Sequence, residues 1–142
     1  MTTTSEQDAL VIHIDGASRG NPGEAGFGIH VQDRSRTTEL YGYLGQATNN
    51  VAEYQALLHA LRHALARGAR HIEIRSDSEL VVRQIEGRYR VKHPGLAPLH
   101  REATELLARF ERAHLRHVAR EENRDADRLA NLALDRRTSC LG

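Results

Sequence analysis

The order of strand-like and helix-like apolar patterns constrains the fold of this chain more than any other feature. Three strand-like segments come first, at Leu10–Asp15, Gly26–Gln32 and Thr37–Leu44. The glycine-rich residues Gly16–Gly28 predict a tight loop followed by a strand, and Asp33–Arg36 predicts a hairpin turn. Because strands joined by short turns usually pair antiparallel, the chain is expected to begin with a three-stranded antiparallel unit.

The rest of the chain alternates between helical and strand patterns. The predicted segments are a helix over Thr48–Arg67, a strand over His71–Ser76, a short helix ending near Gly87, a helix over Leu99–Arg112, a strand over Ala113–Ala119 and a helix over Arg124–Leu134. A strand reached through a helix usually runs parallel to the strand before it. We therefore expect an α/β (α+β) fold with a five-stranded mixed sheet, three antiparallel strands and then two parallel ones, flanked by helices. One domain over residues 10–135 is expected, with tails at 1–9 and 136–142.

Composition excludes several classes of function. The net charge of the 142 residues is only +1, so no strong basic field indicates a nucleic-acid partner. The single cysteine, Cys140, cannot form an internal disulfide, which suits a reducing compartment. No stretch approaches the roughly 18 apolar residues of a membrane span, and Met1–Ala9 is too polar for a signal peptide. We expect a cytoplasmic protein without membrane contact, and a monomer.

Four acidic residues lie at positions that either a metal-binding role or a structural role would explain. Asp15 ends an apolar strand, Asp77 follows another, Glu53 is placed in the first turn of the predicted long helix, and Asp127 lies early in the last one. Each also has a structural explanation, as a helix cap, a dipole partner or a solvated residue. If they converge, buried carboxylates need cations, and hard oxygen ligands suit Mg²⁺ or Mn²⁺. Spacing alone leaves that convergence open.

The residues around these acids resemble the four signature blocks of the type I ribonuclease H family. The blocks are DGASRGNPG from Asp15, TNNVAEYQALLHAL from Thr48, SDSELVVRQI from Ser76 and VAREENRDADRLANLAL from Val118. They occur in the family's order, and each carries one of the acids. The resemblance implies the ribonuclease H-like fold, which agrees with the order of elements inferred above from periodicity.

The resemblance also implies an activity and the residues that support it. The family hydrolyses the RNA strand of RNA–DNA hybrids with two divalent ions, Mg²⁺ or its substitute Mn²⁺, and leaves 5′-phosphate and 3′-hydroxyl ends. By this likeness Asp15, Glu53, Asp77 and Asp127 are the catalytic, metal-binding acids, with Asp15 shared between both ions. No organic cofactor is implied.

A second set of residues matches family positions that contact the hybrid. Asn21, Asn49 and Asn50 correspond to minor-groove contacts, Ser18 lies in the same segment as Asn21, and Thr48 corresponds to a contact with a phosphate of the DNA strand. An Asn amide offers both donors and acceptors, which suits a 2′-hydroxyl. The structural alternative is turn chemistry at Asn21 and helix capping at Thr48 or Asn49, and both roles can coexist.

The sequence departs from some family members in three places. The stretch Gly87–Leu99 is short and lacks Trp, so it leaves only Arg88, Arg90 and Lys92 of a basic protrusion. Glu79 stands where some relatives carry an amide, and the histidine-bearing loop before the last acid is absent.

Two alternatives to the hybrid nuclease stay open. One is a nuclease of the same superfamily with another duplex preference, such as double-stranded RNA, and the other is a non-catalytic hybrid-binding module.

Overall fold

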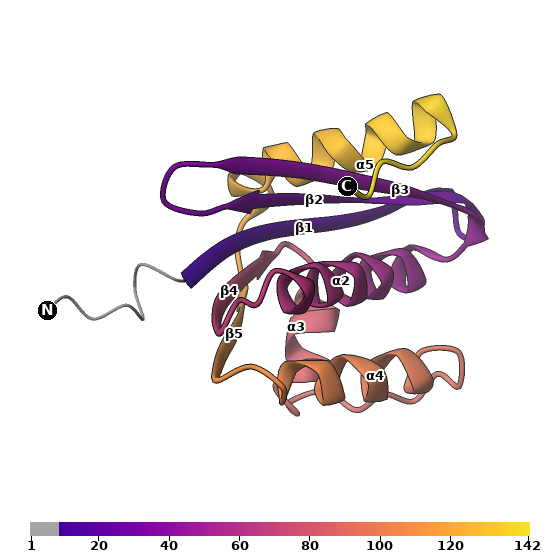
Figure 1. Cartoon of the computed structure of the whole chain (residues 1–142). Coiled ribbons are helices and arrows are strands. Elements are labelled where there is room, and N and C mark those ends of the chain that lie inside the picture. Colours follow the sequence, from indigo (N-terminus) through magenta and orange to yellow (C-terminus); the bar gives the residue numbers. More distant parts are fainter. Residues whose placement is uncertain (1–8) are drawn as a thin grey trace, which may run out of the picture.

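The computed structural model describes residues 9–142, and its five strands form one mixed sheet in the order β3-β2-β1-β4-β5 (Figure 1). β1 pairs antiparallel with β2 and parallel with β4, while β2–β3 is antiparallel and β4–β5 is parallel. The predicted mixed sheet is therefore confirmed. The strands span Ala9–Gly20 (β1), Gly23–Gln32 (β2), Thr37–Ala47 (β3), His71–Ser76 (β4) and Arg112–His117 (β5).

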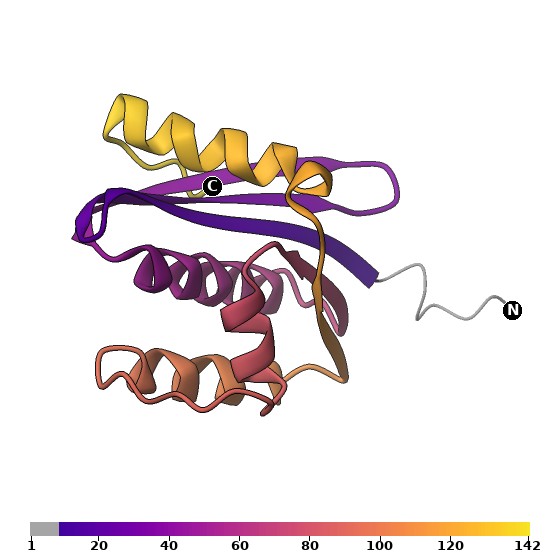
Figure 2. The same ribbon diagram turned by 180° about the vertical axis from the view of Figure 1, so that it is seen from behind.

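Helices cover the two faces of the sheet unequally (Figures 1 and 2). The helices span Asn49–Ala66 (α2), Glu79–Ile85 (α3), Ala97–Leu107 (α4) and Arg124–Arg136 (α5), with a 3₁₀ turn η1 at Arg120–Glu122. α2 packs on one face with α4 outside it, and α5 packs on the opposite face over β1, β2 and β3. None of the helices in the described part of the chain is long and apolar enough to cross a membrane.

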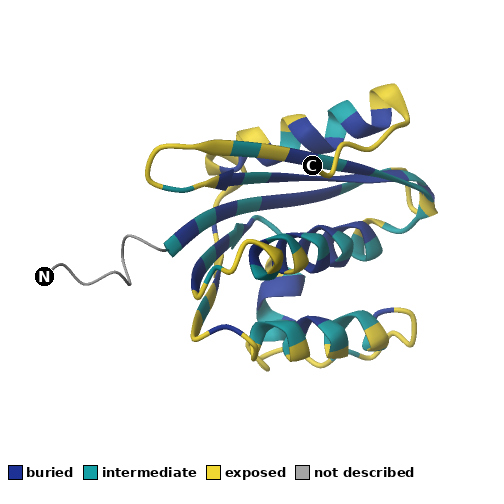
Figure 3. Cartoon of the chain, viewed as in Figure 1, coloured by how far each residue is buried: buried dark blue, intermediate teal, exposed yellow. Residues whose placement is uncertain are grey.

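The main core lies between α2 and the sheet. Burial alternates along Ala9–Ile14 of β1, whereas Ala25–Ile29 of β2 are all buried because helices cover both faces there (Figure 3). The largest fully buried side chains of the core include Ile12, Ile14, Phe27, Ile29, Tyr54, Leu57, Leu58, Leu61 and Ile74. Buried aliphatic and aromatic groups of this kind contribute about 1.5–3 kcal/mol each through removal from water. This core fixes the position of β1 against α2 and so positions Asp15, which directly follows the buried Ile14.

Several element boundaries differ from the sequence predictions, most clearly those of β1, α4 and β5. β1 does not stop at Asp15 but continues through Gly20, so the predicted loop is a strand and the turn is confined to Asn21-Pro22. α4 begins before Leu99 because Pro98 occupies the first turn, where a missing N–H costs no hydrogen bond, and it ends at Leu107. β5 begins at Arg112 and ends two residues before the predicted boundary.

The C-terminal segment pairs with the edge of the sheet. α5 extends to Arg136, which includes the first residue assigned to the tail. Cys140 and Tyr41 exchange backbone hydrogen bonds of 2.8 and 3.0 Å, and the Ser139 hydroxyl accepts one from the Tyr43 N–H. Of the N-terminal tail predicted over residues 1–9, only Ala9 lies within the described residues, and it begins β1.

Candidate active site

Three of the four predicted acids converge where β1, α2 and β4 meet. Asp15 lies in β1, Glu53 in the second turn of α2 and Asp77 directly after β4. One carboxylate oxygen from each lies within 4.8 Å of the other two. Residues far apart in the sequence thus form one compact group of hard oxygen ligands. The predicted first-turn position of Glu53 is wrong by one turn, since the helix begins at Asn49.

Gly16 is the residue that allows Asp15 and Glu53 to approach one another. A Cβ at Gly16 would lie 2.3 Å from the carbonyl carbon of Ala52, which is closer than any real side chain tolerates. Its backbone N–H donates a 2.7 Å hydrogen bond to Oε1 of Glu53. Sequence reasoning assigned the glycines of this segment to a loop and missed this role. The available signal was a glycine directly after an acid that ends an apolar run.

Burial and mutual repulsion raise the pKa values of the clustered acids. Asp15 is 5% exposed and Glu53 is 6% exposed. Burial, together with the charges of Glu53 and Asp77, raises the pKa of Asp15 to about 9. Burial and the charge of Asp77 raise the pKa of Glu53 to about 8, against the lowering effect of the Gly16 hydrogen bond. Burial also raises the pKa of Asp77. These acids therefore resist ionisation near neutral pH unless a bound cation compensates their charge.

Asp127 approaches the same group from the opposite face of the sheet. It lies in the first turn of α5, and its side chain hydrogen-bonds to that of Asp15. α5 reaches the sheet closely because Gly28 has no side chain, and a Cβ there would lie 2.2 Å from the carbonyl oxygen of Ala126. Asp127 is not a member of the tight three-acid group, but its charge acts on both Asp15 and Asp77.

Asn123 is a buried amide that connects the site to the sheet, and sequence reasoning did not single it out. It is fully buried, and its Nδ2 donates a 2.8 Å hydrogen bond to the carbonyl oxygen of Ile14. Its side chain also hydrogen-bonds to Asp77, and its carbonyl accepts from the N–H of Asp127 at 3.1 Å. Oδ1 has no partner among the described residues. A cap-forming residue type just before a helix was the signal available in the sequence.

The predicted substrate residues gather mostly where the β1–β2 turn meets the start of α2. Oδ1 of Asn21 accepts a 3.0 Å hydrogen bond from the N–H of Asn49. Thr48 caps α2 by accepting from the N–H of Val51, so its predicted structural role is confirmed. Asn50 follows in the same helical turn. Ser18 lies in β1 rather than in a loop, because the strand continues to Gly20.

The segment between α3 and α4 is short and irregular over residues 86–96. Tyr54 donates a 2.7 Å hydrogen bond from its hydroxyl to Oε1 of Gln84, and Nε2 of Gln84 donates to the carbonyl oxygen of Arg90. The side chains of Arg88, Arg90 and Lys92 are exposed. The segment is thus held to the core through the Arg90 carbonyl and the buried Leu96, and it presents three cations to solvent.

The donor set fits divalent ions of the hard class. Carboxylate oxygens from several elements form the ligand sets of Mg²⁺ and Mn²⁺, whereas structural zinc sites favour sulfur and nitrogen. Burial and neighbouring carboxylates, rather than a cation, dominate the pKa shifts of Asp15 and Glu53. Arg120 lowers the pKa of Asp77 but does not overcome the effect of burial. A cation at this position would supply the missing charge.

Comparisons with known proteins agree with this geometry. Residues 13–133 match the family model described as "Reverse transcriptase-like". The chain is 46% identical over 129 residues to the bifunctional protein Rv2228c of Mycobacterium tuberculosis, and 44% identical over 125 residues to ribonuclease HI of Halobacterium salinarum. The alignments cover 89% and 87% of this chain, but only 35% and 63% of those proteins, so the chain spans about a third of the first and under two thirds of the second.

Solved structures show the same fold. The N-terminal RNase H domain of Rv2228c, solved as a fusion with maltose-binding protein, superposes with a TM-score of 0.86 at 45% identity, covering 90% of this chain and 94% of that one. RNase H1 of Halobacterium salinarum superposes with a TM-score of 0.86 at 42% identity, and LC11-RNase H1 in complex with an RNA/DNA hybrid superposes with a TM-score of 0.84 at 38% identity. Each alignment covers 90% of this chain and 98% of the solved chain. The protein described here therefore belongs to the type I ribonuclease H family.

Proposed function

We propose that this protein is an endoribonuclease that hydrolyses the RNA strand of RNA–DNA hybrids and leaves 5′-phosphate and 3′-hydroxyl ends. The observation that carries the proposal is the convergence of Asp15, Glu53 and Asp77, with carboxylate oxygens within 4.8 Å of one another. Relatives named ribonuclease H, and the related LC11-RNase H1 solved in complex with an RNA/DNA hybrid, support the same substrate.

Asp15, Glu53, Asp77 and Asp127 would hold two Mg²⁺ ions, with Mn²⁺ as the expected substitute. When bound, such ions neutralise charge at a scissile phosphate and make water a better nucleophile near neutral pH. The protein's own contribution is to fix the carboxylates before the substrate arrives. Gly16 holds Glu53, and Asn123 holds Asp77 against the strand that carries Asp15.

The residues around the β1–β2 turn would bind the hybrid. The amides of Asn21, Asn49 and Asn50 can donate to and accept from a 2′-hydroxyl, which distinguishes RNA from DNA. Oδ1 of Asn21 accepts from the N–H of Asn49, and this leaves the Nδ2 donors of both side chains for substrate. Ser18 would contribute from β1, and Thr48, at the start of α2, would bind a phosphate of the DNA strand.

Cellular context forms a separate part of the proposal. A monomer acting in the cytoplasm agrees with the single exposed cysteine and with the absence of a membrane-spanning helix from the described residues. The N-terminal RNase H domain of Rv2228c was itself solved apart from the rest of that longer protein.

One assay tests the activity against its alternatives. Each strand of RNA–DNA, RNA–RNA and DNA–DNA duplexes is labelled in turn, and cleavage is compared with Mg²⁺, with Mn²⁺ and with EDTA. The expected result is metal-dependent cleavage of the hybrid's RNA strand alone. Asp77→Asn should abolish cleavage while the protein still folds. Glu105 is an exposed acid on α4, so Glu105→Gln should cleave as wild type does. Cleavage of double-stranded RNA would favour the other nuclease, and hybrid binding without cleavage would favour the binding module.

A further inference from the structure

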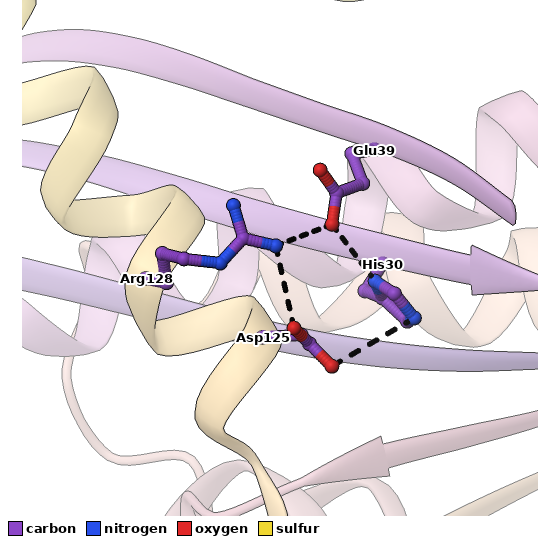
Figure 4. Close-up of polar contacts among 4 residues, drawn as sticks. All are labelled: His30, Glu39, Asp125 and Arg128. Carbon is purple, nitrogen blue, oxygen red and sulfur yellow. Dashed lines mark hydrogen bonds and ion pairs between the residues drawn. The ribbon is translucent and has the colours of Figure 1, made fainter.

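A second group of potential metal ligands lies on the face of the sheet that α5 covers (Figure 4). His30 lies in β2, Glu39 in β3 and Asp125 in the first turn of α5. One nitrogen of His30 and one carboxylate oxygen from each acid lie within 4.8 Å of one another. His30 Nδ1 is 3.3 Å from Glu39 and Nε2 is 3.9 Å from Asp125, so the imidazole lies between the two acids.

We propose that His30, Glu39 and Asp125 form a binding site for a transition-metal ion such as Zn²⁺. This site is separate from the carboxylate centre, which consists of Asp15, Glu53, Asp77 and Asp127. The two sites share no ligand, and their donor chemistry differs. The carboxylate centre offers only oxygen, which suits Mg²⁺, whereas an imidazole with two carboxylates suits Zn²⁺ or Ni²⁺. A tetrahedral ion about 2.0–2.2 Å from each ligand places the ligand atoms roughly 3.3–3.6 Å apart, so side-chain movements of up to about 1.5 Å bring the three ligands together.

Arg128 shows that positive charge is already stabilised at this position (Figure 4). Its guanidinium pairs with Glu39, and the same Nη2 lies 3.3 Å from Asp125. The Arg128 side chain is 51% exposed, so it can move into solvent when an ion enters. Exposed ion pairs contribute little to stability, and a divalent ion competes well with them. Arg128 is therefore a competitor for the site, not a ligand.

A hollow beside His30 supplies space and a further donor. It measures about 410 Å³, and His13, His30 and Asp125 all line it. The rings of His13 and His30 meet edge to face with their centroids 6.3 Å apart. Arg75 also lines the hollow, but its Nε is paired with Glu73 at 2.5 Å. Water in this hollow can therefore complete the coordination of an ion held by the three primary ligands.

An ion at this site would join β2, β3 and α5 and would stabilise the native protein. It would hold the first turn of the helix that carries Asp127, two residues after Asp125. A ligand that binds only the folded state raises the free energy of unfolding by RT ln(1 + L/Kd), where L is the free ligand concentration. Zn²⁺ should accordingly raise the melting temperature even when excess Mg²⁺ fills the carboxylate centre.

The test is calorimetric titration of the metal-stripped protein with Zn²⁺ in excess Mg²⁺, with melting temperature as a second measurement. His30→Gln and Glu39→Gln should each weaken Zn²⁺ binding at least about tenfold, a loss that even outer partners of metal sites produce. Arg128→Ala should tighten it about fivefold, which corresponds to the upper strength of an exposed ion pair. His114→Ala removes an exposed histidine of β5 and should leave binding unchanged.

The opposite signs of these effects make the result decisive. Binding that survives both His30→Gln and Glu39→Gln, or that weakens in Arg128→Ala, would overturn the proposal. So would the lack of any saturable Zn²⁺ binding in excess Mg²⁺. If His30→Gln fails to fold, Glu39→Gln still tests the site, because Glu39 is exposed on the edge strand β3 and the substitution preserves its shape.

Discussion

The backbone N–H of Gly16 and the side chain of Glu53 form a 2.7 Å hydrogen bond that joins strand β1 to helix α2. The two residues are 37 positions apart, and the bond is buried. It orients one carboxylate of the candidate site from the backbone of the strand that carries Asp15. Close packing of backbone against backbone, rather than a flexible loop, therefore determines how these two acids meet.

Gly16→Ala should disrupt both packing and metal binding. The added Cβ would lie 2.3 Å from the Ala52 carbonyl carbon and 2.4 Å from the Glu53 nitrogen, so α2 must move away from β1. We expect a loss of more than about 2 kcal/mol in the free energy of unfolding, measured with urea, and weaker Mg²⁺ binding by calorimetry. Gly95→Ala is the control, because its Cβ would meet only the ring of the exposed His93, at 3.0 Å, and no backbone atom. Equal losses in the two variants would contradict this explanation.

Asp15→Asn should stabilise the metal-free protein at high pH. The folded state raises the pKa of Asp15 from 3.8 to about 9, mainly through burial. Between these values the folded protein retains a proton that the unfolded chain has lost, so wild-type stability falls as pH rises from about 4 to about 9. The variant lacks this loss and should exceed wild type by at least about 1 kcal/mol near pH 8, since one pKa unit corresponds to about 1.4 kcal/mol. Urea unfolding in EDTA across this range measures the difference.

Magnesium provides the matched comparison for that experiment. Mg²⁺ should raise the stability of wild type and reduce its pH dependence, but should affect Asp15→Asn much less, because the neutral amide is a poorer ligand. Asp135→Asn, an exposed acid at the end of α5, should behave as wild type does. If the stability of the wild-type protein in EDTA did not fall as pH rises, the folded state would not raise the pKa values of these buried acids.

Much of this fold follows from periodicity, as the helix of Val51, Leu58 and Leu65 illustrates. Its apolar spacing, its Thr48 cap and its end before Gly68 were all readable from the chain. The relative directions of the strands followed from the rule that hairpins give antiparallel neighbours and crossovers give parallel ones. These features depend on local chemistry, so a single sequence contains them.

The arrangement of the site depends on tertiary contacts that no local pattern records. Gly16 was interpreted as part of a loop because glycine in a strand and glycine in a turn look alike in sequence. Asn123 was not identified, because its role depends on its burial and on its hydrogen bonds to Ile14 and Asp77. The three acids were found through the residues around them, while their convergence depends on how β1, α2 and β4 pack together.

Asn123→Ala should destabilise the protein and loosen the site. It would leave the carbonyl of Ile14 and the carboxylate of Asp77 without their buried donor. Unsatisfied buried groups cost about 1–3 kcal/mol each, so we expect a loss in that range by urea unfolding, together with reduced Mg²⁺ affinity. Asn131→Ala removes a half-buried amide bonded to the Asp127 carbonyl and should cost less. If the two variants were equally stable, burial of Asn123 would not be what stabilises this site.

The exposed cations Arg88, Arg90 and Lys92 should supply part of the grip on the hybrid. A segment anchored through the Arg90 carbonyl can present them to phosphates, and each phosphate contact adds close to one unit to the slope of log affinity against log salt. In an Asp77→Asn background, which should bind without cutting, replacing all three with Ala should reduce that slope by about 2–3 in fluorescence anisotropy. Arg34→Ala with Arg36→Ala, in the turn at the other end of β2 from Asn21, should leave it unchanged. An unaltered slope in the triple variant would mean that these side chains remain in solvent and that the hybrid is held by the β1–β2 turn and α2 alone.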